Sequence, residues 1–292
     1  MFSKVLIANR GEIAVRIIRA CRELGIRTVA VYSEADKEAM HTELADEAVC
    51  IGPSKASESY LNKQQILSAA VLTKAEAIHP GFGFLSENSQ FAEMCEACHI
   101  TFVGPKSQTI DEMGNKIHAR QLMKKAGVPV IPGSDGAIVD VKQALDIANQ
   151  VGYPVMLKAA AGGGGKGIRK VLSEAELPGA FASAQQEAKA AFGNDEMYLE
   201  KIIYPARHIE VQILGDKYGN VLHFGERDCS LQRNNQKVLE ESPSVVISET
   251  NREKLGKIAV KAAKAVSYEN AGTIEFLMDL SGQFYFMEMN TR

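Results

Sequence analysis

The sequence predicts an α/β protein whose N-terminal domain is a doubly wound parallel sheet and whose second domain is organised around a glycine-rich hairpin. Three observations carry this prediction. Short apolar runs alternate with helical apolar spacing through the first 105 residues; a strand, a glycine loop and a strand follow one another at 154–171; and strands with short turns dominate after residue 205. The chain has 292 residues, 46% of them hydrophobic and 24% charged, enough for two or more lobes.

The N-terminal domain begins with a strand at 4–8, a helix whose apolar positions run from 13 to 24, and a strand at 28–32. Gly25 is placed to end the helix. A strand, a helix and a strand at this spacing predict a parallel sheet. The pattern then repeats, with strands at 48–51, 77–79 and 101–103 and helices at 60–71 and 87–98.

Two turns of this domain bear on ligands. The first, Asn9-Arg10-Gly11-Glu12, has one glycine where a dinucleotide fold needs three, so a nicotinamide cofactor with Glu34 on its ribose is disfavoured. The loop at 79–84 combines glycines with two phenylalanines at the edge where open α/β sheets bind ligands. It is either a ligand loop or a rigid turn packed by its aromatic rings, and the residues leave both open.

The second domain is predicted to begin with a helix at 115–126, with Lys116 at its start, and a linker at 127–133. A lid lobe at about 134–203 follows, and strands and a helix succeed it. The predicted elements are helices at 144–151, 180–191 and 250–267, and strands at 197–200, 208–214, 219–224, 273–278 and 284–290. The stretch 226–237 is dense in polar side chains.

The glycine hairpin is the strongest functional signal. Its tip has five glycines: four in a row at 162–165, bracketed by Lys158 and Lys166, and Gly167 directly after Lys166. Glycine backbones can approach a ligand closely and aim several N–H groups at phosphate oxygens, and the lysines supply matching charge. The alternative is a floppy surface loop. A Walker loop is excluded because a glycine, and neither serine nor threonine, follows Lys166.

Acids in the last two strands form the second signal. Glu275 and Glu288 each lie within an apolar strand, where an unpaired carboxylate would be costly, and Asn290 shares the face of Glu288. Carboxylate and amide oxygens suit Mg²⁺ or Mn²⁺. The alternative is a pair of partly exposed acids bridged to lysines. Together with the hairpin, these residues indicate an ATP-dependent transfer enzyme, whose acceptor cannot be derived from them.

Composition excludes other classes. The net charge of −3 gives no basic field for nucleic acid, and no apolar run approaches the roughly 20 residues of a membrane span. The N-terminus has a strand pattern and not the layout of a signal peptide, so we expect a cytoplasmic protein. The five cysteines are scattered, which indicates reduced thiols, and we favour structural thiols over a zinc or redox site for Cys95 and Cys98.

Five motifs, in this order, resemble those of biotin carboxylase, the ATP-grasp component of biotin-dependent carboxylases. They lie at 7–14, 79–88, 162–167, 226–230 and 288–292, and the resemblance covers the whole chain. It is strongest to the bacterial acetyl-CoA carboxylase subunit. It implies an N-terminal domain at 1–113 and an ATP-grasp domain at 114–292, with the lid at about 134–203 and an incomplete C-terminal lobe at 204–292.

The resemblance also implies site roles. Lys237 and Arg292 would bind bicarbonate and act in catalysis, and Phe82 and Gly83 would lie on the biotin side. The metal ligands would be Glu275, Glu288 and Asn290. The ATP contacts would be Lys116, Lys158, Gly164, Gly165, Glu200, Lys201, Ile202, Ile203, His208, Gln232, Asn235, Glu275 and Glu288.

The implied reaction uses ATP, Mg²⁺ or Mn²⁺, and bicarbonate to carboxylate biotin on a carrier protein through carboxyphosphate. In acetyl-CoA carboxylase this is the first half-reaction, in fatty acid synthesis. The implied partners are the biotin carboxyl carrier protein, carboxyltransferase subunits and a second copy of the chain, with no nucleic acid or membrane. Alternatives are a different ATP-grasp ligase and an inactive nucleotide-binding module.

Two features depart from the family pattern. Asn235 stands where many members carry histidine. The chain also stops at Arg292, before the segment in which the family carries its general base and a further arginine. We therefore expect the 292-residue chain to be a fragment that has no turnover on its own.

Overall fold

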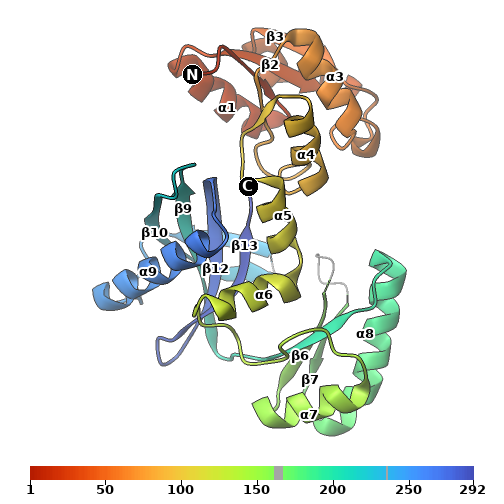
Figure 1. Cartoon of the computed structure of the whole chain (residues 1–292), viewed down its shortest axis with the longest axis vertical. Coiled ribbons are helices and arrows are strands. Elements are labelled where there is room, and N and C mark those ends of the chain that lie inside the picture. Colours follow the sequence, from red (N-terminus) through yellow and green to blue (C-terminus); the bar gives the residue numbers. More distant parts are fainter. Residues whose placement is uncertain (161–166, 235) are drawn as a thin grey trace. The chain divides into compact units, whose positions relative to one another are not determined.

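The computed structural model describes residues 1–160, 167–234 and 236–292 (Figure 1). By their contacts these residues divide into two units. Unit 1 consists of Met1–Asp111, Tyr268–Ala271 and Thr291–Arg292, and unit 2 consists of Glu112–Ser267 and Gly272–Asn290.

Unit 1 contains a five-stranded sheet in the order β3-β2-β1-β4-β5, and every pairing in it is parallel. The predicted doubly wound α/β fold is therefore confirmed. The strands are β1 Lys4–Ile7, β2 Arg27–Tyr32, β3 Glu47–Cys50, β4 Ala77–His79 and β5 Thr101–Phe102. The helices are α1 Gly11–Glu23, α2 Met40–Leu44, α3 Lys63–Thr73 and α4 Ser89–Ala97, and α5 Ser107–Gly114, which the sequence pattern did not predict, crosses into unit 2.

Both faces of this sheet are buried, as a parallel sheet requires. Successive side chains of β1 alternate between two cores: Val5 and Ile7 pack with α1, while Leu6 packs on the opposite face with Val29 and Phe91. The continuous apolar run of β1 follows from this double burial.

The order of the strands creates a switch point between β1 and β4. From β1 the chain continues through α1 to β2 on one side, and from β4 it continues through α4 to β5 on the other. The two strand ends lie side by side, and the N–H of Ala8 donates to the carbonyl of His79 at 2.9 Å. Open α/β sheets bind ligands outside the carboxyl ends of the strands at such a point.

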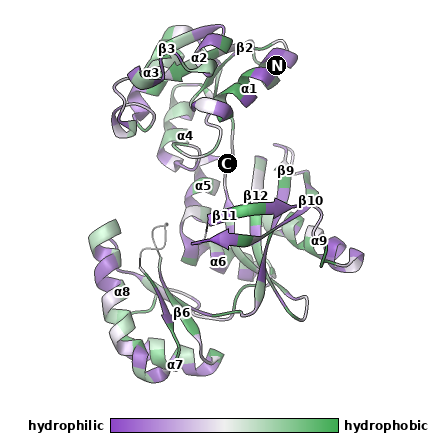
Figure 2. Ribbon diagram, turned by 180° about the vertical axis from the view of Figure 1, so that it is seen from behind, coloured by the Kyte–Doolittle hydropathy of each residue, from purple (hydrophilic) through white to green (hydrophobic). Residues whose placement is uncertain are grey.

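Unit 2 contains a small antiparallel sheet, β7-β6-β8, covered by two helices. Its elements are β6 Val155–Ala159, β7 Ile168–Val171, β8 Met197–Lys201, α7 Val141–Val151 and α8 Leu177–Phe192. One apolar cluster joins both helices to the sheet. Accordingly α8 carries both hydrophobic and hydrophilic residues (Figure 2), with Leu177, Phe181, Ala184 and Ala188 buried. The tip of the predicted hairpin, at 161–166, lies outside the described residues.

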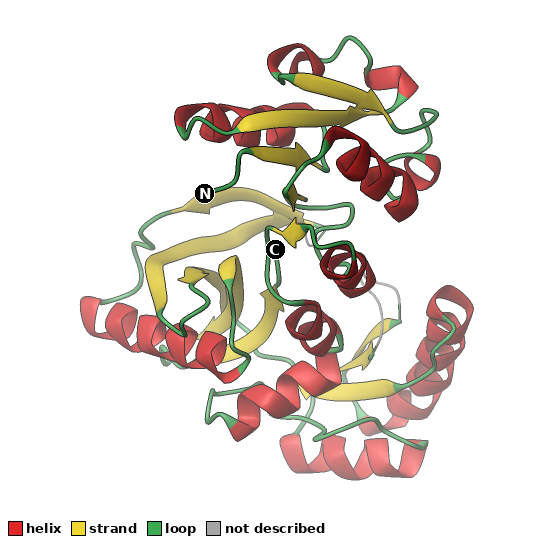
Figure 3. Ribbon diagram, turned by 45° about the horizontal axis from the view of Figure 1, so that its top comes forward, coloured by secondary structure: helices red, strands yellow, loops and turns green. Residues whose placement is uncertain are grey.

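The larger sheet of unit 2 has the order β11-β10-β9-β12-β13, and its long strands are strongly curved (Figure 3). Its strands are β9 Ala206–Gly215, β10 Val221–Arg233, β11 Gln236–Glu241, β12 Asn270–Asp279 and β13 Phe284–Asn290, and α6 Lys116–Lys125 and α9 Glu249–Ala265 accompany it. The polar stretch 226–237 lies mostly in the second half of β10 and the start of β11, whereas the sequence pattern predicted only the first part of β10, as the strand at 219–224. None of the helices in the described part of the chain has both the length and the apolar character that a bilayer crossing requires.

One glycine joins the connecting segment to β8. Gly133 forms an antiparallel bridge with Glu200, and the N–H of Ser134 donates to the carbonyl of Leu199 at 2.8 Å. A Cβ atom on Gly133 would stand 2.1 Å from the Leu199 oxygen, which is backbone and cannot rotate away. Glycine is thus required by close approach.

We expect Gly133→Ala to lower the free energy of unfolding by about 2–3 kcal/mol, because β8 must shift to admit the methyl group. Gly179→Ala is the matched control: it lies in α8, and no atom comes within 4 Å of its added Cβ. The control should stabilise the chain by about 0.5 kcal/mol. Urea denaturation of both variants measures the difference, and equal effects would contradict the account.

Candidate functional site

The side chains of β10 alternate between the two faces of the larger sheet. Glu226 and Asp228 face α9, where Arg252 donates to both oxygens of Glu226 at 2.9 and 3.1 Å and Ser244 donates to Asp228 at 3.1 Å. Arg227 and Cys229 point to the opposite face, which we call the site face. The acids of the 226–230 motif therefore hold the loop before α9, and its other residues belong to the site.

Glu275 is the centre of the site face. It is 5% exposed, and its carboxylate accepts hydrogen bonds at both oxygens. Lys237 and Asn290 donate to Oε1 at 2.9 and 2.8 Å, and Nε2 of His208 lies 2.5 Å from Oε2. Burial alone would raise the pKa of Glu275, but the hydrogen bonds from His208 and Lys237 outweigh it and lower the pKa to about 2.

A second buried acid shares Lys237. Glu210 is 6% exposed; its Oε2 accepts from Lys237 at 2.5 Å, and its Oε1 pairs with Arg227. Burial would lower the pKa of Lys237, but its hydrogen bonds to Glu210 and Glu275 outweigh this and raise the pKa above its ordinary value. Lys237 is therefore held as a cation between two carboxylates.

The hydrogen bonds around His208 settle which ring nitrogen carries the proton. The amide nitrogen of Gln232 lies 2.7 Å from Nδ1 and also donates to the carbonyl of Cys229 at 2.8 Å. Since an amide nitrogen only donates, Nδ1 accepts and the proton lies on Nε2, which donates to Glu275. Gln232 thus orients His208, and His208 orients Glu275.

Glu288 lies directly opposite Glu275 in the antiparallel pairing of β12 with β13. The two carboxylates share the site face, and Asn290, opposite Thr273, shares it as well. Lys116 lies 3.7 Å from Glu288, whose side chain is 39% exposed. Two carboxylates and an amide, all oxygen donors from neighbouring strands, fit a magnesium-type ion. The pairing register thus brings together the two acids and the amide that the sequence singled out.

The lid strands carry a third group of charges. Lys158 of β6 donates to Glu200 of β8 at 2.6 Å and lies 5.9 Å from the centre of the Tyr198 ring. Arg120 lies 3.6 Å from the other oxygen of Glu200. Lys201 turns its side chain to the carbonyls of Gly152 and Tyr153, at 2.7 and 2.8 Å.

The neighbouring backbone of the lid is also engaged. The N–H of Ile202 donates to the carbonyl of Pro154 at 3.0 Å, and Ile203 follows it in the chain, partly buried. Three predicted contacts, Gly164, Gly165 and Asn235, lie outside the described residues.

Other predicted residues belong to unit 1. Phe82 is 53% exposed on the loop after β4, beside Gly83. Arg292 donates from Nε to Glu87 at 2.9 Å. Sequence reasoning missed Glu87 and Glu210. The sequence could have revealed Glu210, because it lies two residues after His208 in a predicted strand and must therefore share the face of His208.

Comparison with known protein families shows to which family the chain belongs. Residues 1–110 match the biotin carboxylase N-terminal domain, and residues 115–292 match the ATP-binding domain of the carbamoyl-phosphate synthase L chain. Biotin carboxylase 1 of Bacillus subtilis is 60% identical over 100% of this chain. This chain belongs to the biotin carboxylase family.

Solved biotin carboxylases show the same fold. A biotin carboxylase complex with β-γ-ATP from Campylobacter jejuni superposes with a TM-score of 0.96, at 53% identity, over 100% of this chain and 66% of that one. The biotin carboxylase domain dimer of Hydrogenobacter thermophilus 2-oxoglutarate carboxylase, with MgADP, ADP and bicarbonate, superposes at 0.94 with 54% identity, over 100% and 64%. The chain spans 65% of the length of the Bacillus relative.

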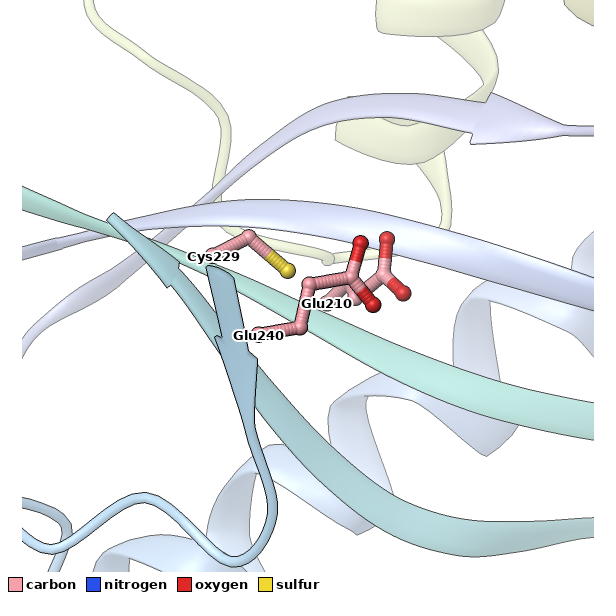
Figure 4. A group of neighbouring side chains, drawn as sticks. All are labelled: Glu210, Cys229 and Glu240. Carbon is pink, nitrogen blue, oxygen red and sulfur yellow. The ribbon is translucent and has the colours of Figure 1, made fainter. Parts of the chain in front are cut away.

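One further group on the site face resembles a metal site. Glu210, Cys229 and Glu240 come from three neighbouring strands and place their donor atoms within 4.8 Å of one another (Figure 4). Burial, followed by the charge of Glu210, raises the pKa of Cys229 to about 12, and Glu210 is already paired with Arg227 and Lys237. Because Arg227 and Lys237 already pair with Glu210, and Arg227 lies 3.7 Å from Glu240, we read the group as part of the charge network. All five cysteines, each within the described residues, are free thiols, as expected.

We expect Lys237→Met to lower the free energy of unfolding by about 2–4 kcal/mol, because it leaves two buried carboxylates facing each other without their shared cation. The matched control is Lys189→Met, which removes a lysine from a surface pair with Asp195, with side chains 72% and 44% exposed. That change should cost less than about 1 kcal/mol. Urea denaturation compares them, and a loss no larger than the control's would show that the shared cation does not stabilise the site.

Proposed function

We propose that this protein carboxylates biotin with bicarbonate at the cost of ATP. The observation that carries the proposal is the pairing of two parts on one sheet face: an oxygen-donor set of Glu275, Glu288 and Asn290, and the buried cation Lys237 beside it. A divalent metal and a fixed lysine are what phosphoryl transfer to a small anion requires. Membership in the biotin carboxylase family supports the choice of substrate.

In this proposal Glu275, Glu288 and Asn290 hold Mg²⁺ or Mn²⁺, which neutralises charge on the ATP phosphates when bound. Lys237 binds bicarbonate, because its raised pKa keeps it cationic and Glu210 and Glu275 hold its position. Arg292 acts with it as the second bicarbonate and catalytic residue. Bicarbonate oxygen attacks the γ-phosphorus, ADP leaves, and the resulting carboxyphosphate breaks to CO₂ and phosphate. CO₂ then joins N1 of biotin, and the N1 proton passes to the phosphate just released.

The remaining assignments concern ATP and biotin. Phe82 and Gly83 lie on the biotin side. Support for the ATP contacts comes from the charges on β6, β8 and the site face. The proposed contacts are Lys116, Lys158, Gly164, Gly165, Glu200, Lys201, Ile202, Ile203, His208, Gln232, Asn235, Glu275 and Glu288.

Finer features of the proposal follow from the family. Biotin is presented on a carrier protein, carboxyltransferase subunits use the product, and the protein forms a homodimer, as in the domain dimer of the Hydrogenobacter enzyme. We propose acetyl-CoA carboxylase, hence fatty acid synthesis, as the pathway, although the Hydrogenobacter relative belongs to a 2-oxoglutarate carboxylase. The domains are proposed at 1–113 and 114–292. The free cysteines favour a cytoplasmic location.

We expect the chain to bind ATP more tightly with Mg²⁺ than with EDTA, and Glu288→Gln to reduce that Mg²⁺-dependent gain by at least about tenfold, because a ligand carboxylate is lost. Isothermal titration calorimetry with ATP measures both. Glu253→Gln, an exposed acid on α9, is the matched control and should behave as the unsubstituted chain does.

An unchanged Mg²⁺ gain in Glu288→Gln would favour the alternative of a nucleotide-binding module with structural acids. Binding without any effect of Mg²⁺ on either protein would reject the metal assignment altogether.

Carboxylation is tested in a chimaera in which Arg292 is followed by the part of Bacillus subtilis biotin carboxylase 1 beyond the matched region. We expect ATP cleavage that requires bicarbonate and is stimulated by free biotin, and ¹⁴C transfer from bicarbonate to biotin. Lys237→Met should lower that rate by about 100-fold or more, because a positioned charge at the reacting anion is lost.

The 292-residue chain alone is the comparison, and we expect no turnover from it. ATP cleavage by the chimaera that ignores bicarbonate would instead indicate another ATP-grasp ligase.

A further inference from the structure

The loop after β4, residues 80–84, holds an aromatic residue in a conformation that side chains rarely adopt. Phe84 has φ of 46°, in the left-handed region, which is unusual for a bulky residue. Such a conformation costs free energy and persists only when surrounding contacts over-determine it. The contacts around Phe84 therefore determine the conformation of the loop.

Tyr60 supplies the contact at the far end of the loop. The rings of Tyr60 and Phe84 are stacked, with centroids 5.0 Å apart and an angle of 21° between the planes. Tyr60 is itself immobilised: it is 2% exposed, its hydroxyl donates to Asp36 at 2.7 Å, and it accepts from the N–H of Ser33 at 3.0 Å. The ring that supports Phe84 is thus anchored to a buried carboxylate.

Asn9 holds the near end. It is 3% exposed, and its amide nitrogen donates to the carbonyls of Pro80 and Phe82 at 2.7 and 2.9 Å, while its oxygen accepts from the N–H of Arg10 at 2.9 Å. Asn9 follows β1, the strand beside β4, so this clamp joins the two strand ends at the switch point.

Asp36 links the Tyr60 contact at one end of the loop to the Asn9 contacts at the other. Arg10, which follows Asn9, forms an ion pair with the same Asp36 that accepts from Tyr60. The loop is therefore braced from both ends by one connected polar network, while Phe82 between them remains 53% exposed. A braced loop that presents an exposed aromatic ring at a ligand-binding position has the character of a preorganised binding surface.

We propose that Tyr60 is a positioning residue for biotin, acting through its stack on Phe84 to hold Phe82 and Gly83 in the biotin-binding arrangement. The inference rests on the proposed function, in which Phe82 and Gly83 lie on the biotin side. Tyr60 does not touch biotin itself, because it is buried beneath Phe84. Its contribution is to reduce the ordering cost that biotin would otherwise meet on binding.

The test uses Tyr60→Leu, Phe84→Leu and the double variant, with Tyr60→Phe to keep the ring but remove its hydroxyl. Hydrogen exchange of amides 80–88 reports the order of the loop, and NMR titration with free biotin gives the dissociation constant. We expect Tyr60→Leu to raise both the exchange rates and the biotin dissociation constant by about two- to tenfold, the range of an aromatic pair.

The double variant separates positioning from a general packing role. If Tyr60 acts through Phe84, Phe84→Leu gives the same effects, and the double variant adds little to either single change. Affinity for ATP with Mg²⁺, whose proposed contacts belong to unit 2, should be unchanged. Tyr218→Leu, which removes a tyrosine that is 78% exposed in unit 2, is the control for loss of a ring.

Additive effects of the two single changes, or loop exchange that is unaltered in Tyr60→Leu, would overturn the proposal. So would a loosened loop that binds biotin as tightly as before. Should Tyr60→Leu fail to fold, Phe84→Leu and Tyr60→Phe decide the matter by the same two measurements. Failure of the unsubstituted chain to bind biotin would count against the proposed function itself, whereas the exchange data report on Tyr60 alone.

Discussion

The ammonium group of Lys237, shared by two buried carboxylates, is the interaction on which the site face depends. Glu210 and Glu275 come from different strands and would repel each other in a poorly hydrated environment. With Lys237 between them, and with Arg227 and His208 on their outer oxygens, each charge has a partner. The curved strands β9, β11 and β12 are thereby tied together at the point where the chemistry is proposed.

The same arrangement explains why charged residues can occupy strand interiors here. Glu275 binds donors from three directions, and Glu288 across from it remains partly exposed beside Lys116. In the proposed metal site, a buried and fully paired acid would be a rigid ligand and the more open acid beside it an adaptable one. Unit 1 uses a related device, since Asp36 gathers Arg10, Tyr60 and Ser33 around one buried carboxylate.

Sequence reasoning found what depends on period and local chemistry. Alternation along β13 placed Glu288 and Asn290 on one face, and the β-α-β spacing predicted the parallel sheet, whereas the register that sets Glu275 opposite Glu288 comes from the structure. It did not find contacts that depend on register between distant strands. The partnership of Lys237 with Glu210 joins β11 to β9 across β10, and nothing in either segment specifies that pairing.

The strand that carries the 226–230 motif was hidden for another physical reason. Its polar residues have partners on both faces of the sheet, so the apolar alternation by which a half-buried strand is recognised is missing. Arg227 finds Glu210 on one side, and Glu226 finds Arg252 on the other. The sequence pattern also does not predict a strained residue in a short loop, such as Phe84, because the conformation of such a loop is set by the residues that pack on it.

The irregularity in β10 decides which of its side chains reach the site face. His223 and Glu226 are three residues apart, an odd separation that would put them on opposite sides of a regular strand, yet both meet α9. A bulge between them, with Gly225 at φ of 84°, absorbs the extra residue. Without that extra residue the alternation beyond it would be reversed, and Glu226 and Asp228 would face the site in place of Arg227 and Cys229.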